Sequence, residues 1–168
     1  MFGVIKALHG MLQLLLRSDD PRAIALRERF VFKLVPMINP DGVFRGHYRA
    51  DTRGLNLNRC YLTATPEHHP SVHAIMVLVR QLHERGELQF YIDTHAHASK
   101  RGCFLYGNAL PEQLQLVEAV TYAKLVEQNC RWFDFEGCTF SQASMSAKEP
   151  RDGGGAGKEG SGRVGVYR

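Results

Sequence analysis

The stretch Phe90-Tyr91-Ile92-Asp93-Thr94-His95-Ala96-His97 (FYIDTHAH, residues 90–97) decides the fold class. Three apolar residues and an Asp lead into two histidines, which predicts a short buried strand that ends at His95. In open α/β sheets, ligands bind at the carboxyl ends of the strands. Because neutral imidazole is the commonest metal ligand in proteins, His95 is a candidate metal ligand. The alternative is that both histidines are ordinary polar residues at a strand end.

The segments on both sides of this stretch alternate between helical and strand patterns. Apolar spacing and capping signals predict helices at residues 3–17, 21–29, 71–85 and 111–130. Apolar and β-branched runs predict further strands at residues 30–38 and 104–106, and a strand that begins at residues 164–167. This alternation predicts an α/β fold with a mixed, largely parallel sheet flanked by helices.

Length and composition favour an ordinary globular chain. The 168 residues, 44% of them hydrophobic, suggest one domain or part of a larger one. The net charge of +4 permits an acidic partner, but no Lys/Arg run marks a nucleic-acid arm, and no apolar run suits a membrane span. The four cysteines include no C-x-x-C pair, so we expect a reduced, intracellular protein without a zinc ribbon.

The polar, irregular stretch at residues 43–70 contains a second group of candidates. It follows the turn signal Asn-Pro-Asp-Gly at residues 39–42 and carries Arg49, Asn58 and Arg59. Guanidinium groups bind carboxylates through two parallel hydrogen bonds, and a neighbouring Asn can add a third. The pattern therefore predicts a site for a free carboxylate, and the alternative is a set of solvated loop charges.

The order of these motifs resembles the zinc carboxypeptidase family. A strand, Asn-Pro-Asp-Gly, an Arg, Asn-Leu-Asn-Arg, a helix and Asp-Thr-His-Ala-His follow one another along residues 30–108, which also include HASKRGCFLYGN. Within the family the resemblance is to the cytosolic carboxypeptidases. The later segments FDFEGC and KEGSGRV are similar to the branch that removes glutamate at branch points of polyglutamylated tubulin.

This resemblance implies a role for several residues. His95 corresponds to the third zinc ligand, and Asn58 with Arg59 to the pair that holds the terminal carboxylate of the substrate. Arg49 corresponds to the catalytic arginine that polarises the scissile carbonyl and stabilises the oxyanion. We add the hypothesis that Lys100 or Arg101, just past the zinc histidine, attracts the glutamate side chain.

The implied activity is metal-assisted hydrolysis of a C-terminal or side-chain-linked glutamate. One zinc ion per complete domain would polarise the carbonyl and activate water. The implied partners are glutamylated protein tails, tubulin above all, in the cytoplasm or also the nucleus. Asp93 and His97 have no direct role by this correspondence; they either support the metal ligand or make strand-end hydrogen bonds.

Two parts of the family pattern are absent. The His-x-x-Glu zinc motif has no counterpart, because the only upstream histidine is His9 and Leu12 stands three residues later. The general-base glutamate is expected on a strand that begins at residues 164–168 or follows them. We therefore expect residues 1–168 to be the central part of a catalytic domain, incomplete at both ends, with a flexible glycine-rich loop at residues 151–162.

Three interpretations remain open at this point. The chain is a fragment, a partial gene model or a splice product of a working enzyme; or it is a truncated protein that binds acidic tails without hydrolysing them; or it is a fragment that does not fold alone. In each case we expect this chain by itself not to hold zinc and to have little or no hydrolase activity.

Overall fold

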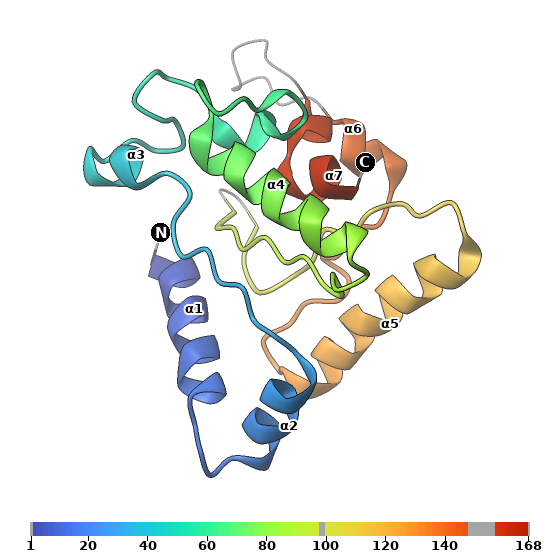
Figure 1. Ribbon diagram of the computed structural model, residues 1–168. Coiled ribbons are helices and arrows are strands. Elements are labelled where there is room, and N and C mark those ends of the chain that lie inside the picture. The colour runs from blue at the N-terminus through green and yellow to red at the C-terminus, as the bar shows by residue number, and fades with distance from the viewer. Residues whose placement is uncertain (1, 98–99, 148–156, 168) are drawn as a thin grey trace. The chain divides into compact units, whose positions relative to one another are not determined.

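The computed structural model describes residues 2–97, 100–147 and 157–167 and divides into two compact units (Figure 1). The first unit comprises residues 1–38 and 94–99, and the second comprises residues 39–93 and 100–168. The regular elements in the described part of the chain are all helices. None of these helices combines the length and the apolar character that a membrane span requires.

The first unit is built from two helices, α1 (Phe2–Leu15) and α2 (Pro21–Arg29), and both confirm the sequence prediction. Asp20 caps α2, since its carboxylate accepts a hydrogen bond from the Arg22 backbone N–H at 3.0 Å. The Arg22 guanidinium also pairs with this carboxylate and lowers the pKa of Asp20. The Arg27 guanidinium donates to the carbonyl oxygen of Arg17 at 2.8 Å and so ties α2 to the turn that precedes it.

The prediction of a strand at residues 30–38 is wrong. The backbone leaves α2 in an extended conformation at Phe30, but residues 30–38 are not assigned to any strand. Their side chains are largely exposed, with Val31 at 82%. An apolar, β-branched run favours extended backbone, whereas a strand also needs a hydrogen-bonded neighbour. Among the described residues no strand pairs with this segment.

The second unit contains the remaining helices. Two of them confirm predicted helices: α4 (Pro70–Glu84), which ends before Gly86 with its φ of 69°, and α5 (Gln113–Asn129). The shorter elements are α3 (Pro40–Phe44), η1 (Leu57–Arg59), η2 (Tyr61–Thr63), α6 (Gln142–Ser146), η4 (Lys158–Gly160) and α7 (Gly162–Tyr167). Because α7 is a helix, the strand predicted to begin at residues 164–167 is also wrong.

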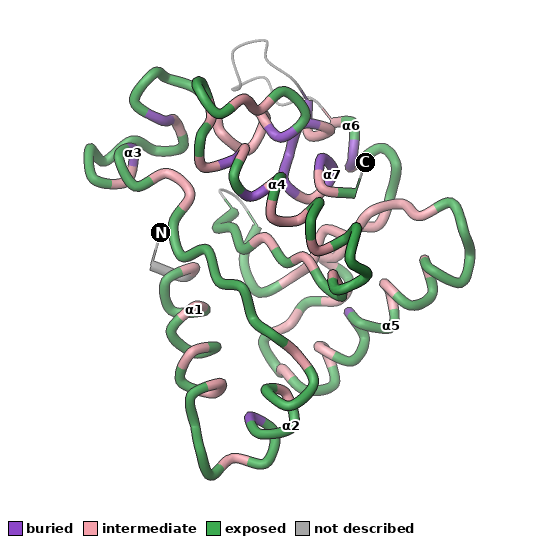
Figure 2. Tube along the Cα trace, viewed as in Figure 1, coloured by how far each residue is buried: buried purple, intermediate pink, exposed green. Residues whose placement is uncertain are grey.

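The core of the second unit forms where α4, η2 and α7 meet (Figure 2). Val72 on α4 and Val164 on α7 are fully buried, and Tyr61 on η2 is 4% exposed. The second half of the predicted glycine-rich loop belongs to this core, because Gly157, Gly160, Ser161 and Gly162 are buried. Residues 148–156, which include the first half of that loop, lie outside the described part of the chain.

The sheet of the predicted α/β fold is not found in the described residues. The segment at residues 90–95 is not assigned to a strand, and Phe90 and Ile92 are 61% and 58% exposed. The predicted strand at 104–106 appears as two isolated parallel bridges, Cys103 to Phe133 and Tyr106 to Thr139. Two isolated bridges do not form a sheet, because a sheet requires long-range partners that a local pattern does not specify.

Candidate functional site

Five of the six predicted site residues lie in the second unit. Arg49 is exposed in the loop after α3, Asn58 and Arg59 are half-buried in η1, and Lys100 and Arg101 are exposed before the first parallel bridge. His95 is exposed and belongs to the first unit. The structure therefore brings Asn58 and Arg59 together and assigns the candidate metal ligand to a separate unit.

Asn58 and Arg59 are held by the glycine-rich segment near the C-terminal end. The Gly162 backbone N–H donates to Asn58 Oδ1 at 2.8 Å, and Arg59 Nη1 donates to the Asn58 carbonyl oxygen at 2.7 Å. A Cβ atom on Gly160 would lie 2.3 Å from the Arg59 carbonyl oxygen, so only glycine allows this close approach. Asn58 and Arg59, the pair predicted to bind a carboxylate, therefore pack against η4 and the start of α7.

The same segment packs against two tyrosines, Tyr61, which is buried, and Tyr91, which is half-buried. A Cβ atom on Gly162 would meet the Tyr91 hydroxyl and an Asp93 carboxylate oxygen, each at 2.8 Å. The side chains of Tyr61 and Tyr91 interact with each other, and burial raises the pKa of both. Asp93 adds to the increase through its negative charge. Asp93 therefore lies beside this pair, within the second unit.

Three cationic side chains surround the ring of Tyr106. Lys100 Nζ lies 5.2 Å from the ring centroid, Lys158 Nζ lies 5.6 Å from it and Arg163 Cζ lies 6.0 Å from it. We call Tyr106 with these three residues the Tyr106 cluster. A cation over the face of an aromatic ring is attracted by the electrons of that ring. The cluster concentrates positive charge beside the parallel bridge at Tyr106.

Arg163 is the best-anchored cation of the Tyr106 cluster. Its guanidinium donates to the carbonyl oxygens of Gly107 and Ser144, the latter at 3.2 Å, and to Asn108 Oδ1 at 3.3 Å. Burial lowers the pKa of Arg163, and the interaction with Tyr106 partly offsets this. Lys100 is also fixed, because its Nζ donates to the Gly137 carbonyl oxygen at 3.0 Å.

Sequence reasoning predicted Lys100 but missed Lys158, Arg163 and Tyr106 as site candidates. The segment KEGSGRV was recognised as a motif, and it contains both missed cations. The cluster cannot be recognised from the sequence, because Lys158 and Arg163 lie far from Lys100 along the chain. No local pattern relates residues near 100 to residues near 160. Arg101 is exposed beside Lys100, next to Gly102 with its φ of 86°.

The residues present do not fit a zinc site. No group of three or more His, Cys, Asp or Glu side chains is placed to hold a metal ion within residues 2–97, 100–147 and 157–167. A catalytic zinc site needs about three protein ligands. Within the described residues, His95 is a single candidate ligand and does not meet this requirement.

Comparison with known proteins identifies the family. The chain belongs to the zinc carboxypeptidase family, since residues 5–112 match the sequence profile of that family. It is similar to the zebrafish (Danio rerio) protein named cytosolic carboxypeptidase-like protein 5, with 35% identity over 95% of the chain and 29% of the relative. It is also similar to human cytosolic carboxypeptidase 6, with 37% identity over 77% of the chain and 26% of the relative.

A solved structure supports the relationship at the level of the fold. A carboxypeptidase A-like protein from Shewanella denitrificans aligns with a TM-score of 0.70 and 28% identity, over 95% of this chain and 40% of that one. The chain thus spans less than a third of the length of the curated relatives it matches. The zebrafish alignment runs over 256 residues, so that relative carries residues within the aligned region that this chain of 168 lacks.

Proposed function

We propose that this chain binds the glutamate-rich end of a protein tail, and that the reaction it serves is the removal of glutamate from such tails. Glutamylated tubulin in the cytoplasm is the proposed partner. The observation that carries the proposal is the Tyr106 cluster, where Lys100, Lys158 and Arg163 direct three positive charges at one aromatic ring. A stretch of glutamates is the peptide chemistry that complements such a cluster.

The strength of single contacts supports a repeated acidic ligand. An exposed ion pair contributes only about 0.2–1 kcal/mol, so one glutamate side chain would bind weakly. Several carboxylates on one peptide can contact several cations at once. We therefore propose a tail with consecutive glutamates, whose side chains contact the Tyr106 cluster and whose terminal carboxylate contacts Asn58 and Arg59.

The anchoring of Asn58 supports its assignment to the terminal carboxylate. Its side-chain oxygen accepts the Gly162 N–H, and this bond determines which end of the amide is the oxygen. The opposite end carries the N–H donors that a carboxylate requires. Arg59 follows directly and is half-buried, as expected of a guanidinium that binds through fixed geometry.

The roles of Arg49, Arg101 and His95 are part of the same proposal. Arg49 is the candidate cation beside the scissile carbonyl, where it would stabilise negative charge. Arg101 is an additional candidate contact for a glutamate side chain. His95 is the candidate zinc ligand of the family site, although the residues described here do not form that site.

Peptide binding by the chain tests the proposal. We would titrate the 168-residue protein into a labelled Gly-Glu-Glu-Glu peptide and follow fluorescence anisotropy, with Gly-Gln-Gln-Gln as the matched neutral peptide. The proposal predicts tighter binding of the glutamate peptide and a loss of the difference at high salt. Equal affinity for the two peptides would overturn it.

The same samples separate hydrolysis from binding alone. After incubation with added zinc, free glutamate would be measured by mass spectrometry. Released glutamate would show that the chain is a hydrolase by itself. Binding without release would favour the acidic-tail-binding alternative for this chain.

A further inference from the structure

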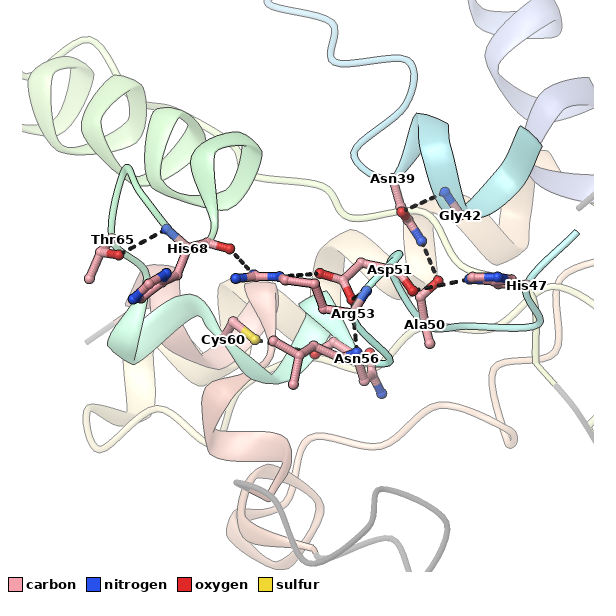
Figure 3. Close-up of polar contacts among 11 residues, drawn as sticks. Asn39, Gly42, His47, Ala50, Asp51, Arg53, Asn56, Cys60, Thr65 and His68 are labelled. Atoms are coloured by element: carbon pink, nitrogen blue, oxygen red, sulfur yellow. Dashed lines mark hydrogen bonds and ion pairs between the residues drawn. The ribbon is translucent and has the colours of Figure 1, made fainter. Parts of the chain in front are cut away.

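The side chain of Asn39 links the first turn of α3 to the loop that carries Arg49 (Figure 3). Its Oδ1 accepts the Gly42 backbone N–H at 3.1 Å and so caps the first turn of α3. Its Nδ2 donates to the carbonyl oxygen of Ala50 at 2.9 Å. Ala50 directly follows Arg49, so the amide of Asn39 holds the peptide group between Ala50 and Asp51, one residue beyond the candidate catalytic arginine.

Gly42 makes this bridge sterically possible. A Cβ atom at Gly42 would lie 2.3 Å from Asn39 Nδ2 and 2.5 Å from the Ala50 carbonyl oxygen. Gly42 is buried, and its backbone passes directly beside the hydrogen bond between the two. The Asn and Gly of the Asn-Pro-Asp-Gly motif therefore act together: one makes the bridge and the other leaves room for it.

A second bridge closes the same loop from the other side. His47 Nδ1 lies 3.0 Å from the Asp51 carbonyl oxygen, and the His47 backbone N–H donates to the Gly42 carbonyl oxygen at 2.8 Å. The loop from His47 to Asp51 is thus closed across Arg49. Asp51 is itself held, because its carboxylate accepts the Leu55 N–H at 2.8 Å.

We propose that Asn39 is a positioning residue for Arg49. Through Ala50 it fixes the backbone from which the Arg49 side chain extends, so that the guanidinium meets the ligand without first ordering its loop. The role in ligand binding rests on the proposed function, whereas the mechanical link between Asn39 and the loop does not. Ordering a loop on ligand binding costs conformational entropy and weakens the affinity. A loop that is already ordered in the free protein avoids this cost when the ligand binds.

The variant Asn39→Ser separates the bridge from the helix cap. Serine is also a good N-cap, so α3 is retained, but its shorter side chain has no amide to reach Ala50. The matched control is Asn129→Ser, since Asn129 Nδ2 makes the same kind of bond to the Leu125 carbonyl oxygen at 2.7 Å on α5. We expect N39S to bind Gly-Glu-Glu-Glu about threefold to tenfold more weakly than the wild type, and N129S to bind it unchanged.

A double-mutant cycle with Arg49→Ala distinguishes positioning from general destabilisation. If Asn39 acts through Arg49, N39S has no further effect on peptide affinity once Arg49 is alanine. A purely structural defect would weaken binding equally in both backgrounds, and that result would overturn the proposal.

Hydrogen exchange separates failure of this inference from failure of the proposed function. In the absence of peptide, N39S should speed amide exchange at residues 47–51 by at least about threefold, whereas N129S should leave this segment unchanged. If the wild type binds no acidic peptide but N39S speeds this exchange, the proposed function is wrong and the Asn39 link stands. Unchanged exchange at residues 47–51 in N39S would overturn the inference itself.

Discussion

The Gly162 backbone N–H donates to the side-chain oxygen of Asn58 at 2.8 Å and joins two residues that are 104 positions apart in the sequence. This bond connects the candidate carboxylate-binding pair to the segment that supplies Lys158 and Arg163. The glycine-rich segment therefore both supports Asn58 and brings two cations to Tyr106.

Gly160→Ala should destabilise the protein. A Cβ atom there would lie 2.3 Å from the Arg59 carbonyl oxygen, and backbone cannot move aside as a flexible side chain can. Overpacking of this kind costs about 1–3 kcal/mol, which urea denaturation would measure. Gly10→Ala on α1 is the matched control, because a Cβ atom there meets nothing within 4 Å. It should stabilise α1 by about 0.5–1 kcal/mol. A stable G160A protein would contradict the close packing of η1 on η4.

Asn58→Asp should separate folding from binding. Aspartate keeps an oxygen to accept the Gly162 N–H, so we expect the unfolding midpoint to change little. The added negative charge would repel a terminal carboxylate and replace the amide donors, so affinity for Gly-Glu-Glu-Glu should fall at least about tenfold. Asn129→Asp adds the same charge on α5 and should have a much smaller effect. Similar losses in both variants would show that net charge alone is responsible.

Lys158→Gln should weaken binding of the glutamate peptide by about threefold to fivefold, as expected for the loss of one charge contact at the surface of the protein. Lys124→Gln is the matched control, because Lys124 Nζ also lies against an aromatic ring, 3.6 Å from the centroid of Phe135. It should leave peptide affinity unchanged. Calorimetric titration at low and high salt would measure both variants. A K124Q effect as large as that of K158Q would argue against a localised site.

The raised pKa values of Tyr61 and Tyr91 predict that the protein loses stability in strong alkali. Burial raises the pKa of Tyr91 above 10, so between pH 10 and the folded-state value the unfolded chain has released a proton that the folded chain retains. The free energy of unfolding should therefore fall as pH rises above about 10, by up to about 1.4 kcal/mol per pH unit for this residue. Tyr91→Phe should reduce that slope relative to Tyr122→Phe on α5. An unchanged slope in Y91F would contradict the assignment.

The sequence predicted the helices well because each carries local signals. Asp20 with Pro21 marks the start of α2, and Gly86 marks the end of α4. The sheet was not predictable in the same way. Phe90 and Ile92 have strand-forming side chains, but local preference does not supply the neighbouring strands, and both residues are exposed in the described structure.

The candidate site was predictable only in part, for a similar reason. Asn58 and Arg59 are adjacent in sequence and could be identified as a pair. Lys100, Lys158 and Arg163 meet only through the fold, at the ring of Tyr106. The segment KEGSGRV was recognisable as a motif, but its two contributions, cations for Tyr106 and support for Asn58, depend on contacts across more than 50 residues.

The central claim is that an acidic peptide end binds at the Tyr106 cluster and at Asn58 with Arg59. Two-dimensional NMR of the labelled 18.9 kDa chain during titration with Gly-Glu-Glu-Glu tests this most directly. We predict saturable shift changes at Asn58, Arg59, Lys100, Tyr106 and Arg163 that are absent with Gly-Gln-Gln-Gln. Shift changes confined to α1 and α2, or identical changes with the two peptides, would contradict the account.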